Sequence, residues 1–115
     1  MHKEFLELLT LLFNKSNHSY QTYLNRGKTF QYAQDLKIHN SKALKLLVEN
    51  KQSMPENLQG DIQLLIEHYT EWSQKWEKLA AEKDFQPDDE FVFANDVTFP
   101  KQAAQNLEAA FQKLK

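Results

Sequence analysis

Residues 58–79 carry the most regular apolar pattern in the chain. Seven apolar residues follow one another there at alternating steps of four and three, namely Leu58, Ile62, Leu65, Tyr69, Trp72, Trp76 and Leu79. Residues at these steps fall on one side of an α-helix, so the pattern predicts a helix with a continuous apolar stripe. We expect the rest of the chain to pack against this stripe.

The scarcity of turn-forming residues also favours helices. A chain of 115 residues has the size of one domain, and this one contains only 2 glycines and 3 prolines. Folds made of β-strands need many turns, and turns are rich in these two residues. We therefore predict an all-α fold with a single domain at residues 1–115, a four-helix bundle with three long helices and one short C-terminal helix.

The four helices are expected at about residues 2–25, 29–52, 53–83 and 98–115. Gly27 would end the first helix, and Thr29 and Thr98 would cap the starts of the second and the fourth. Ser53 and Glu56 have the spacing of a capping box, in which each side chain bonds the other residue's backbone N–H. The predicted inner face of the last helix consists of Ala104, Leu107, Phe111 and Leu114.

The connection between the third and fourth helices, residues 84–98, is long and combines phenylalanines with acidic residues. An extended segment laid across an apolar surface would turn alternate residues toward it. The apolar residues at odd positions are Phe85, Phe91, Phe93 and Val97. Alternatively, residues 87–90 open a single helical turn. In both cases the phenylalanines predict an ordered crossover that is held against the bundle.

A polar residue, Asn40, interrupts the apolar stripe of the second helix between Leu36 and Leu44. A single Asn in an apolar seam can fix the register of neighbouring helices. The alternative is that Asn40 turns to the edge of the bundle and binds water. Residues 14–19 are polar and weak helix formers, so they mark a place where the first helix can bend or break.

The chain lacks the residue patterns of the common catalytic and metal-binding sites. Without cysteine it has no disulfide, iron–sulfur cluster or thiol chemistry. No acidic residue precedes a histidine by three positions, no two histidines have the spacing of a helical metal site, and no glycine-rich loop is present. No serine lies in a Gly-x-Ser-x-Gly turn. We therefore predict no catalytic residue, no cofactor site and no metal site, and we expect that the protein is not an enzyme.

Charge is distributed unevenly along the chain. Residues 15–51 have seven basic and two acidic side chains, a net +5, whereas residues 52–115 have six basic and twelve acidic ones, a net −6. Attraction between the two regions within one fold accounts for this, and a basic surface for a polyanion is the alternative. Arg26 is the only arginine. Because base recognition depends heavily on arginine, we expect no specific nucleic-acid binding.

The apolar run at residues 5–13 invites comparison with a signal peptide. Glu4 and Glu7 interrupt it, and no cleavage site of small residues follows. The run is also shorter than the ~20 residues that span a bilayer. We therefore expect a cytoplasmic protein without a transmembrane segment.

Tyr69, Trp72 and Trp76 form a ladder of aromatic side chains, each about one helical turn from the next. Large aromatic side chains on the central stripe of a helix favour a position in the core. The alternative is that the ladder stacks against the ring of a bound ligand.

Surplus apolar residues supply the main functional hypothesis. A bundle of this size has a limited interior, so some of them should lie on the surface, where an apolar patch commonly marks a contact site. We expect a small protein–protein interaction or adaptor module that associates with itself as a homodimer. The candidate partner contacts are Leu6, Leu11, Phe13, Tyr32 and Ile38 of the helices and Phe91 and Phe93 of the crossover.

Two other functions remain open at this point. Amphipathic helices that open could bind a lipid surface or a hydrophobic polymer granule. Alternatively, the protein binds a small ligand in the region of Tyr69, Trp72 and Trp76, with His68 beside them. This last hypothesis requires a cavity next to the ladder.

Overall fold

The computed structural model describes residues 2–92 and 99–114. Within them it contains four α-helices, α1 (His2–Arg26), α2 (Phe30–Asn50), α3 (Glu56–Ala80) and α4 (Lys101–Leu114), and one turn of 3-10 helix, η1 (Lys51–Ser53). The described residues form no β-strand, only an isolated bridge between Thr29 and Glu90. The predicted all-α bundle of three long helices and one short one is confirmed.

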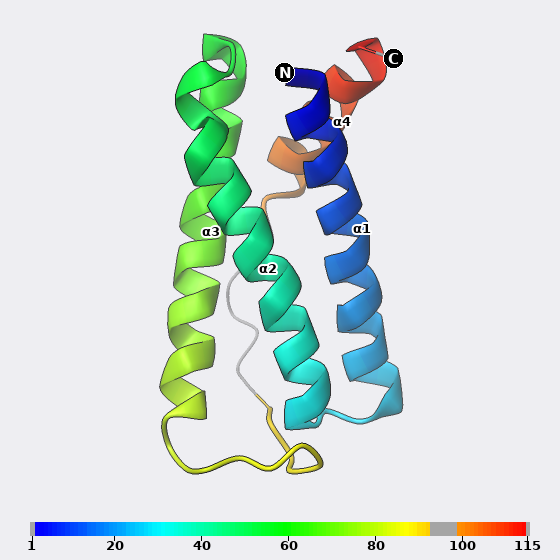
Figure 1. Cartoon of the computed structure of the whole chain (residues 1–115), viewed down its shortest axis with the longest axis vertical. Helices are drawn as coiled ribbons and strands as arrows, with labels where there is room; N and C mark the ends of the chain where they lie inside the picture. Colours follow the sequence, from blue (N-terminus) through cyan, green and yellow to red (C-terminus); the bar gives the residue numbers. More distant parts are fainter. Residues whose placement is uncertain (1, 93–98, 115) are drawn as a thin grey trace.

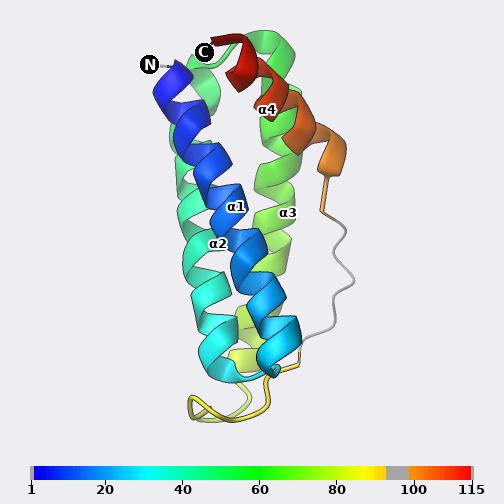
Figure 2. The same cartoon turned by 90° about the vertical axis from the view of Figure 1, so that its right-hand side faces the viewer.

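The fourth helix reaches only one end of the bundle. The helices α1, α2 and α3 run along the long axis of the molecule, which measures 43 Å, while α4 lies near the start of α1 (Figure 1). There α4 leans across the bundle and contacts both α1 and α3 (Figure 2). With 14 residues against 25 in α1, α4 is about 21 Å long and α1 about 38 Å. The bundle therefore has a four-helix half, which includes α4, and a three-helix half, which ends at the connection after α3.

The predicted start of α3 is wrong in detail. Pro55 occupies the N-cap position, no side chain caps the helix, and the Ser53 hydroxyl donates to Asn50 O at 3.0 Å inside the 3-10 turn. The expected capping box with Glu56 is therefore absent, because the chain tightens before the proline rather than entering α3 directly. The end signal of α1 is confirmed, since Gly27 follows the helix with a φ of 116°. Helix α1 runs unbroken through its polar residues 14–19.

The start of α2 is capped by backbone from the distant crossover. Thr29 is the N-cap residue, as predicted, but its side chain makes no capping hydrogen bond. Instead, Phe30 N–H donates to Asp89 O at 2.8 Å and Gln31 N–H donates to Pro87 O at 2.9 Å. The first N–H groups of a helix lack partners within it, so these carbonyls satisfy two of them. The alternative of a helical turn at residues 87–90 is wrong, because this segment is a turn whose carbonyls face α2.

Two clusters of buried side chains form the core. The cluster of the four-helix half is mostly aliphatic and includes Leu6, Leu9, Leu47, Ile62, Leu65 and Leu107. The cluster of the three-helix half is mostly aromatic and consists of Tyr23, Ala33, Leu36, Trp72, Trp76 and Phe91. The stripe predicted at residues 58–79 joins both clusters: its first six members are buried, and Leu79 packs against the aromatic cluster.

The predicted inner face of α4 is confirmed at Leu107 and Phe111 and wrong at Ala104 and Leu114. Ala103, Leu107 and Phe111 are buried, whereas Ala104 is half-buried and Leu114 is exposed. Neighbouring alanines made the choice ambiguous, and the structure selects the one four residues before Leu107. The expected cap residue Thr98 lies outside the described residues.

The described part of the crossover is held against the bundle by its aromatic rings. The ring of Phe30 at the start of α2 stacks on Phe85, with centroids 5.3 Å apart, and meets the edge of Phe91 at 5.2 Å. Phe91 N–H donates to Lys28 O at 2.8 Å, and the Tyr23 hydroxyl donates to Phe91 O. Phe85 and Phe91 thus pack as predicted. Phe93 and Val97 lie outside the described residues.

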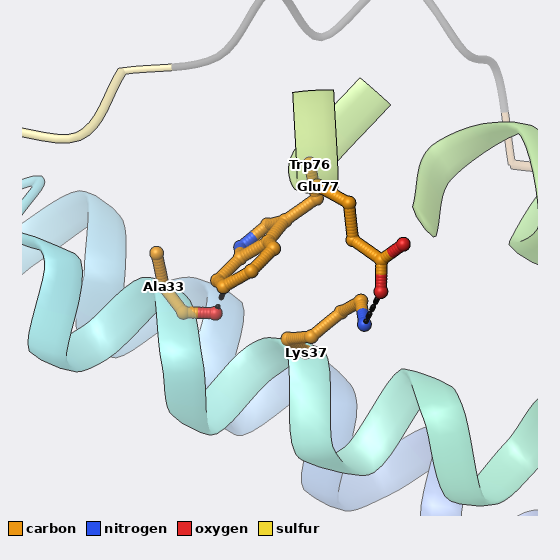
Figure 3. Close-up of polar contacts among 4 residues, drawn as sticks. All are labelled: Ala33, Lys37, Trp76 and Glu77. Carbon is orange, nitrogen blue, oxygen red and sulfur yellow. Dashed lines mark hydrogen bonds and ion pairs between the residues drawn. The ribbon is translucent and has the colours of Figure 1, made fainter. Parts of the chain in front are cut away.

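Helix α3 is tied to α2 by a polar contact next to the aromatic cluster. Trp76 Nε1 donates to Ala33 O at 3.2 Å. One residue later, Glu77 pairs with Lys37 Nζ at 3.0 Å (Figure 3). The ammonium group of Lys37 also lies 5.2 Å from the centroid of the Trp76 ring. This ion pair joins the basic and acidic regions of the chain, as internal attraction would require.

Candidate ligand-binding groove

A groove with a volume of about 690 Å³ lies where the two halves of the bundle meet. Its sides are residues 13–20 of α1 and residues 68–72 of α3, and residues 99–108 at the start of α4 close one end. Leu36 and Asn40 of α2 line it as well. Helices α1 and α3 continue past the point where α4 begins (Figure 2).

Aromatic rings make up much of the groove wall. The rings of Phe13 and Phe99 meet edge to face with centroids 6.0 Å apart, and the His68 ring meets Phe99 at 5.2 Å. Tyr20 and Trp72 line the groove farther toward the three-helix half. Such a wall offers large apolar surfaces to a ring or a hydrocarbon chain.

A buried polar pair lies beside these rings. The Ser16 hydroxyl donates to Asn40 Oδ1 at 2.7 Å, and both residues are buried and line the groove. Asn40 is 6% exposed, so it does not turn to the edge of the bundle. The pair joins α1 to α2, which excludes the position at the edge of the bundle, and the role of Asn40 in the register stays a prediction. No described residue accepts a hydrogen bond from Asn40 Nδ2.

The hydroxyl group of Tyr69 is a second buried polar group of the groove. Tyr69 is 2% exposed, and no described residue hydrogen bonds to its hydroxyl. Burial raises the pKa of this phenol, because an apolar environment disfavours the phenolate. Tyr69 therefore remains a neutral O–H donor across the physiological pH range.

Charged residues occupy the end of the groove formed by α4. Lys101 is exposed in the first turn of this helix, and Glu108 is exposed about two turns later. The positive end of the helix dipole lies on the same side as Lys101. The first turn of α4 is thus the electropositive end of the groove, and Glu108 is the acidic group farther along.

The predicted partner contacts do not all lie on the surface of the protein. Leu6 and Phe91 are 2% and 1% exposed, so the expectation that they face a partner is wrong. They fill the two core clusters instead. Leu11 and Ile38 are exposed, at 47% and 50%. The remaining three are Phe13 and Tyr32, which are half-buried, and Phe93, which lies outside the described residues.

The aromatic ladder has both of the environments considered for it. Tyr69, Trp72 and Trp76 are buried, as the core interpretation predicts. Tyr69 and Trp72 also line the groove, whereas Trp76 packs in the aromatic cluster. The small-ligand hypothesis requires a cavity, and an open groove lies beside two members of the ladder.

Ser16, Asn17 and Lys101 of the groove were not singled out in the sequence. Ser16 and Asn17 belong to the polar residues 14–19, which were interpreted only as a weak point of the first helix. Their signal was the presence of a second polar interruption, Asn40, on the neighbouring helix. Two polar interruptions on adjacent apolar faces indicate a polar contact between the helices.

The described residues contain no group of three or more His, Asp or Glu side chains placed to hold a metal ion. None of the helices in residues 2–92 and 99–114 has the length and apolar character needed to cross a membrane. Comparison of the chain with protein-family models, with curated protein sequences and with solved structures gives no match. The function is therefore argued from the groove itself.

Proposed function

We propose that the protein binds a small molecule in the groove between α1, α3 and the start of α4. The observation that carries this proposal is the composition of the groove: aromatic walls surround a few buried polar groups. Sites for small molecules have this composition and volumes of about 300–1,000 Å³, and the groove has about 690 Å³. The proposal develops the hypothesis that placed a ligand beside Tyr69 and Trp72.

The proposed role is binding without chemical conversion. Ser16 is the serine in the groove, and its hydroxyl donates to an amide oxygen rather than to a base. A serine in such a bond lacks the activation that a nucleophile requires. Tyr69 is held neutral by burial, so it suits hydrogen bonding better than proton abstraction.

A screen of chemically diverse small molecules, followed by tryptophan fluorescence, tests the proposal. Trp72 lines the groove, so a bound compound should change the emission in a saturable way. Asn17→Phe adds a ring to the groove wall and should weaken binding. Asn25→Phe places the same ring on the exposed surface of α1, away from the groove, and should leave binding unchanged. The proposal fails if no compound binds, or if both variants bind every compound as the parent does.

A second candidate function is self-association through the outer face of α1. Leu8 and Leu11 are 50% and 47% exposed and lie about one turn apart. An apolar strip of this kind suits a two-fold contact between identical chains. Light scattering across a concentration series should give twice the chain mass, and Leu8→Ser with Leu11→Ser should return the monomer. Leu64→Ser, at an equally exposed site on α3, is the control. A monomer at every concentration would exclude this function.

A further inference from the structure

The chemistry of the ligand can be inferred from the buried donors of the groove. Asn40 Nδ2 and the Tyr69 hydroxyl both belong to side chains that are more than nine-tenths buried. Neither group is hydrogen bonded within the described residues. Neither atom is among the fully enclosed side-chain atoms that lack a partner, so both are open to the groove, where water or a ligand group accepts from them. A ligand that displaces the water must bring an acceptor of its own, or it loses those bonds.

The groups around this position favour an anionic acceptor. Asn40 and Tyr69 present N–H and O–H, and the Ser16 hydroxyl already donates its proton to Asn40. Lys101 and the first turn of α4 add positive charge at the α4 end of the groove. An ionised carboxylate accepts hydrogen bonds through two oxygens and donates none, which matches a set of donors and a cation.

We propose that the groove binds a monocarboxylate with an apolar body, its carboxylate accepting from Asn40 and Tyr69 under the charge of Lys101. The apolar body lies against Phe13, Tyr20 and Trp72. This inference rests on the proposed function, because it names the class of ligand for the same groove.

The limited positive charge of the groove sets the ligand apart from a phosphate ester. Lys101 is the one lysine among the described lining residues, which include no arginine. Phosphate sites commonly combine arginine with glycine-rich backbone, and neither is present here. Glu108 lies farther along α4 and offsets part of the charge of Lys101, which disfavours a doubly charged phosphate more strongly than a singly charged carboxylate. A single carboxylate is therefore the anion that the groove accommodates.

Isothermal titration calorimetry with three related probes tests the inference. The probes are 2-naphthoate, its methyl ester and 2-methylnaphthalene, which share one ring system and differ in charge and in acceptor oxygens. We expect 2-naphthoate to bind roughly 10-fold or more tightly than either neutral probe, the difference that a charge-assisted hydrogen bond supplies. Equal binding of all three probes, weakened by Asn17→Phe, would keep the proposed function and overturn the carboxylate assignment. Binding of none of them would count against both.

Two substitutions locate the carboxylate. Tyr69→Phe removes the hydroxyl and should weaken 2-naphthoate by roughly 5- to 10-fold, with little effect on 2-methylnaphthalene. Lys101→Gln should weaken the acid selectively and reduce the dependence of its affinity on salt. Tyr32→Phe and Lys113→Gln make the same changes outside the groove and should leave the affinity unchanged. Loss of affinity for acid and hydrocarbon alike, or for neither, would overturn the proposed position of the carboxylate.

Discussion

In the four-helix half of the bundle, aliphatic side chains from all four helices interdigitate, with Leu6 of α1, Leu47 of α2, Leu65 of α3 and Leu107 of α4 as examples. In the three-helix half, large rings fill the same cross-section without a fourth helix, and Phe91 of the crossover is the most buried of them. Both halves have a packed interior. In the four-helix half a fourth helix completes it, and in the three-helix half large side chains do so.

The difference explains where the groove lies. The aliphatic cluster is enclosed by all four helices, and the fourth of them, α4, begins only at Lys101. The rings of the three-helix half gather around Phe30, Trp76 and Phe91, away from the start of α4. The groove lies at the change from one packing mode to the other, next to Tyr69 of the first cluster and Trp72 of the second.

The comparison assumes that Phe91 of the crossover is part of the core of the three-helix half, and its truncation tests this. Phe91→Ala should destabilise the protein by about 3–5 kcal/mol, similar to the about 2–5 kcal/mol expected for Leu107→Ala in the other half. Urea unfolding measures both. Val92→Ala, at the exposed next residue, should change stability by less than about 0.5 kcal/mol. A cost of Phe91→Ala below about 1 kcal/mol would mean that the ring cluster is not a core.

The contribution of the polar pair Ser16 and Asn40 to stability can be measured by removing one or both partners. Ser16→Ala leaves the buried Oδ1 of Asn40 without its donor and should cost about 1–3 kcal/mol. Adding Asn40→Leu should recover most of that loss, because replacing both partners leaves no unsatisfied group. Denaturant unfolding of both variants checks this, with Ser19→Ala on the same helix as the control. Equal stability of Ser16→Ala and the parent would exclude a structural role for the pair.

A smaller effect is expected from the polar contact beside the ring cluster. Trp76→Phe keeps a ring but loses the bond to Ala33 O, and this should cost about 0.5–1.5 kcal/mol in addition to the lost volume. Glu77→Gln removes the exposed carboxylate that pairs with Lys37. This change should cost less than about 1 kcal/mol. Thermal and urea unfolding distinguish the two. A larger cost for Glu77→Gln than for Trp76→Phe would show that charge rather than ring packing holds α2 to α3.

The smallest expected effect concerns pH and the half-buried His39 of α2. Burial lowers the pKa of His39 below 6.5, Lys42 and Lys15 lower it further, and Asp35 opposes them. The unfolded chain therefore binds the proton at higher pH than the folded chain. The neutral histidine contributes fully to the free energy of unfolding above pH 6.5, and this contribution is lost as the pH falls through the pKa of the folded state. His39→Gln should reduce the loss of stability between about pH 7.5 and about pH 5. Urea unfolding at both pH values checks this, and an unchanged loss would contradict it. His18→Gln is the control.

The parts of the fold that could be predicted are those encoded within a few turns of helix. The stripe from Leu58 to Trp76 needs only its own spacing, and Gly27 marks the end of α1 by its backbone freedom. The burial of Leu6 was missed because α1 is apolar nearly all round at its start. Which of its sides face the core depends on where α2 and α4 pack.

The groove could be predicted only in part for the same reason. Tyr69 and Trp72 stood out by their spacing, yet the cavity beside them depends on where α4 begins relative to α1 and α3. The bond between Ser16 and Asn40 joins residues 24 positions apart, and no local pattern reports such a pairing. Lys101 had no signal at all, because a lysine near a helix start is ordinary on a solvated surface.

The caps at the start of α2 carry a consequence for the order in which the protein folds. The N–H groups of Phe30 and Gln31 donate to the carbonyls of Asp89 and Pro87. These two residues are synthesised only after α3. Until then this end of α2 lacks partners and should fray, while the opposite end of the α1–α2 hairpin can already pack through Leu9 and Leu47. The amide protons of Phe30 and Gln31 thus report the docking of residues 87–91, and their exchange with solvent should slow only when the crossover arrives.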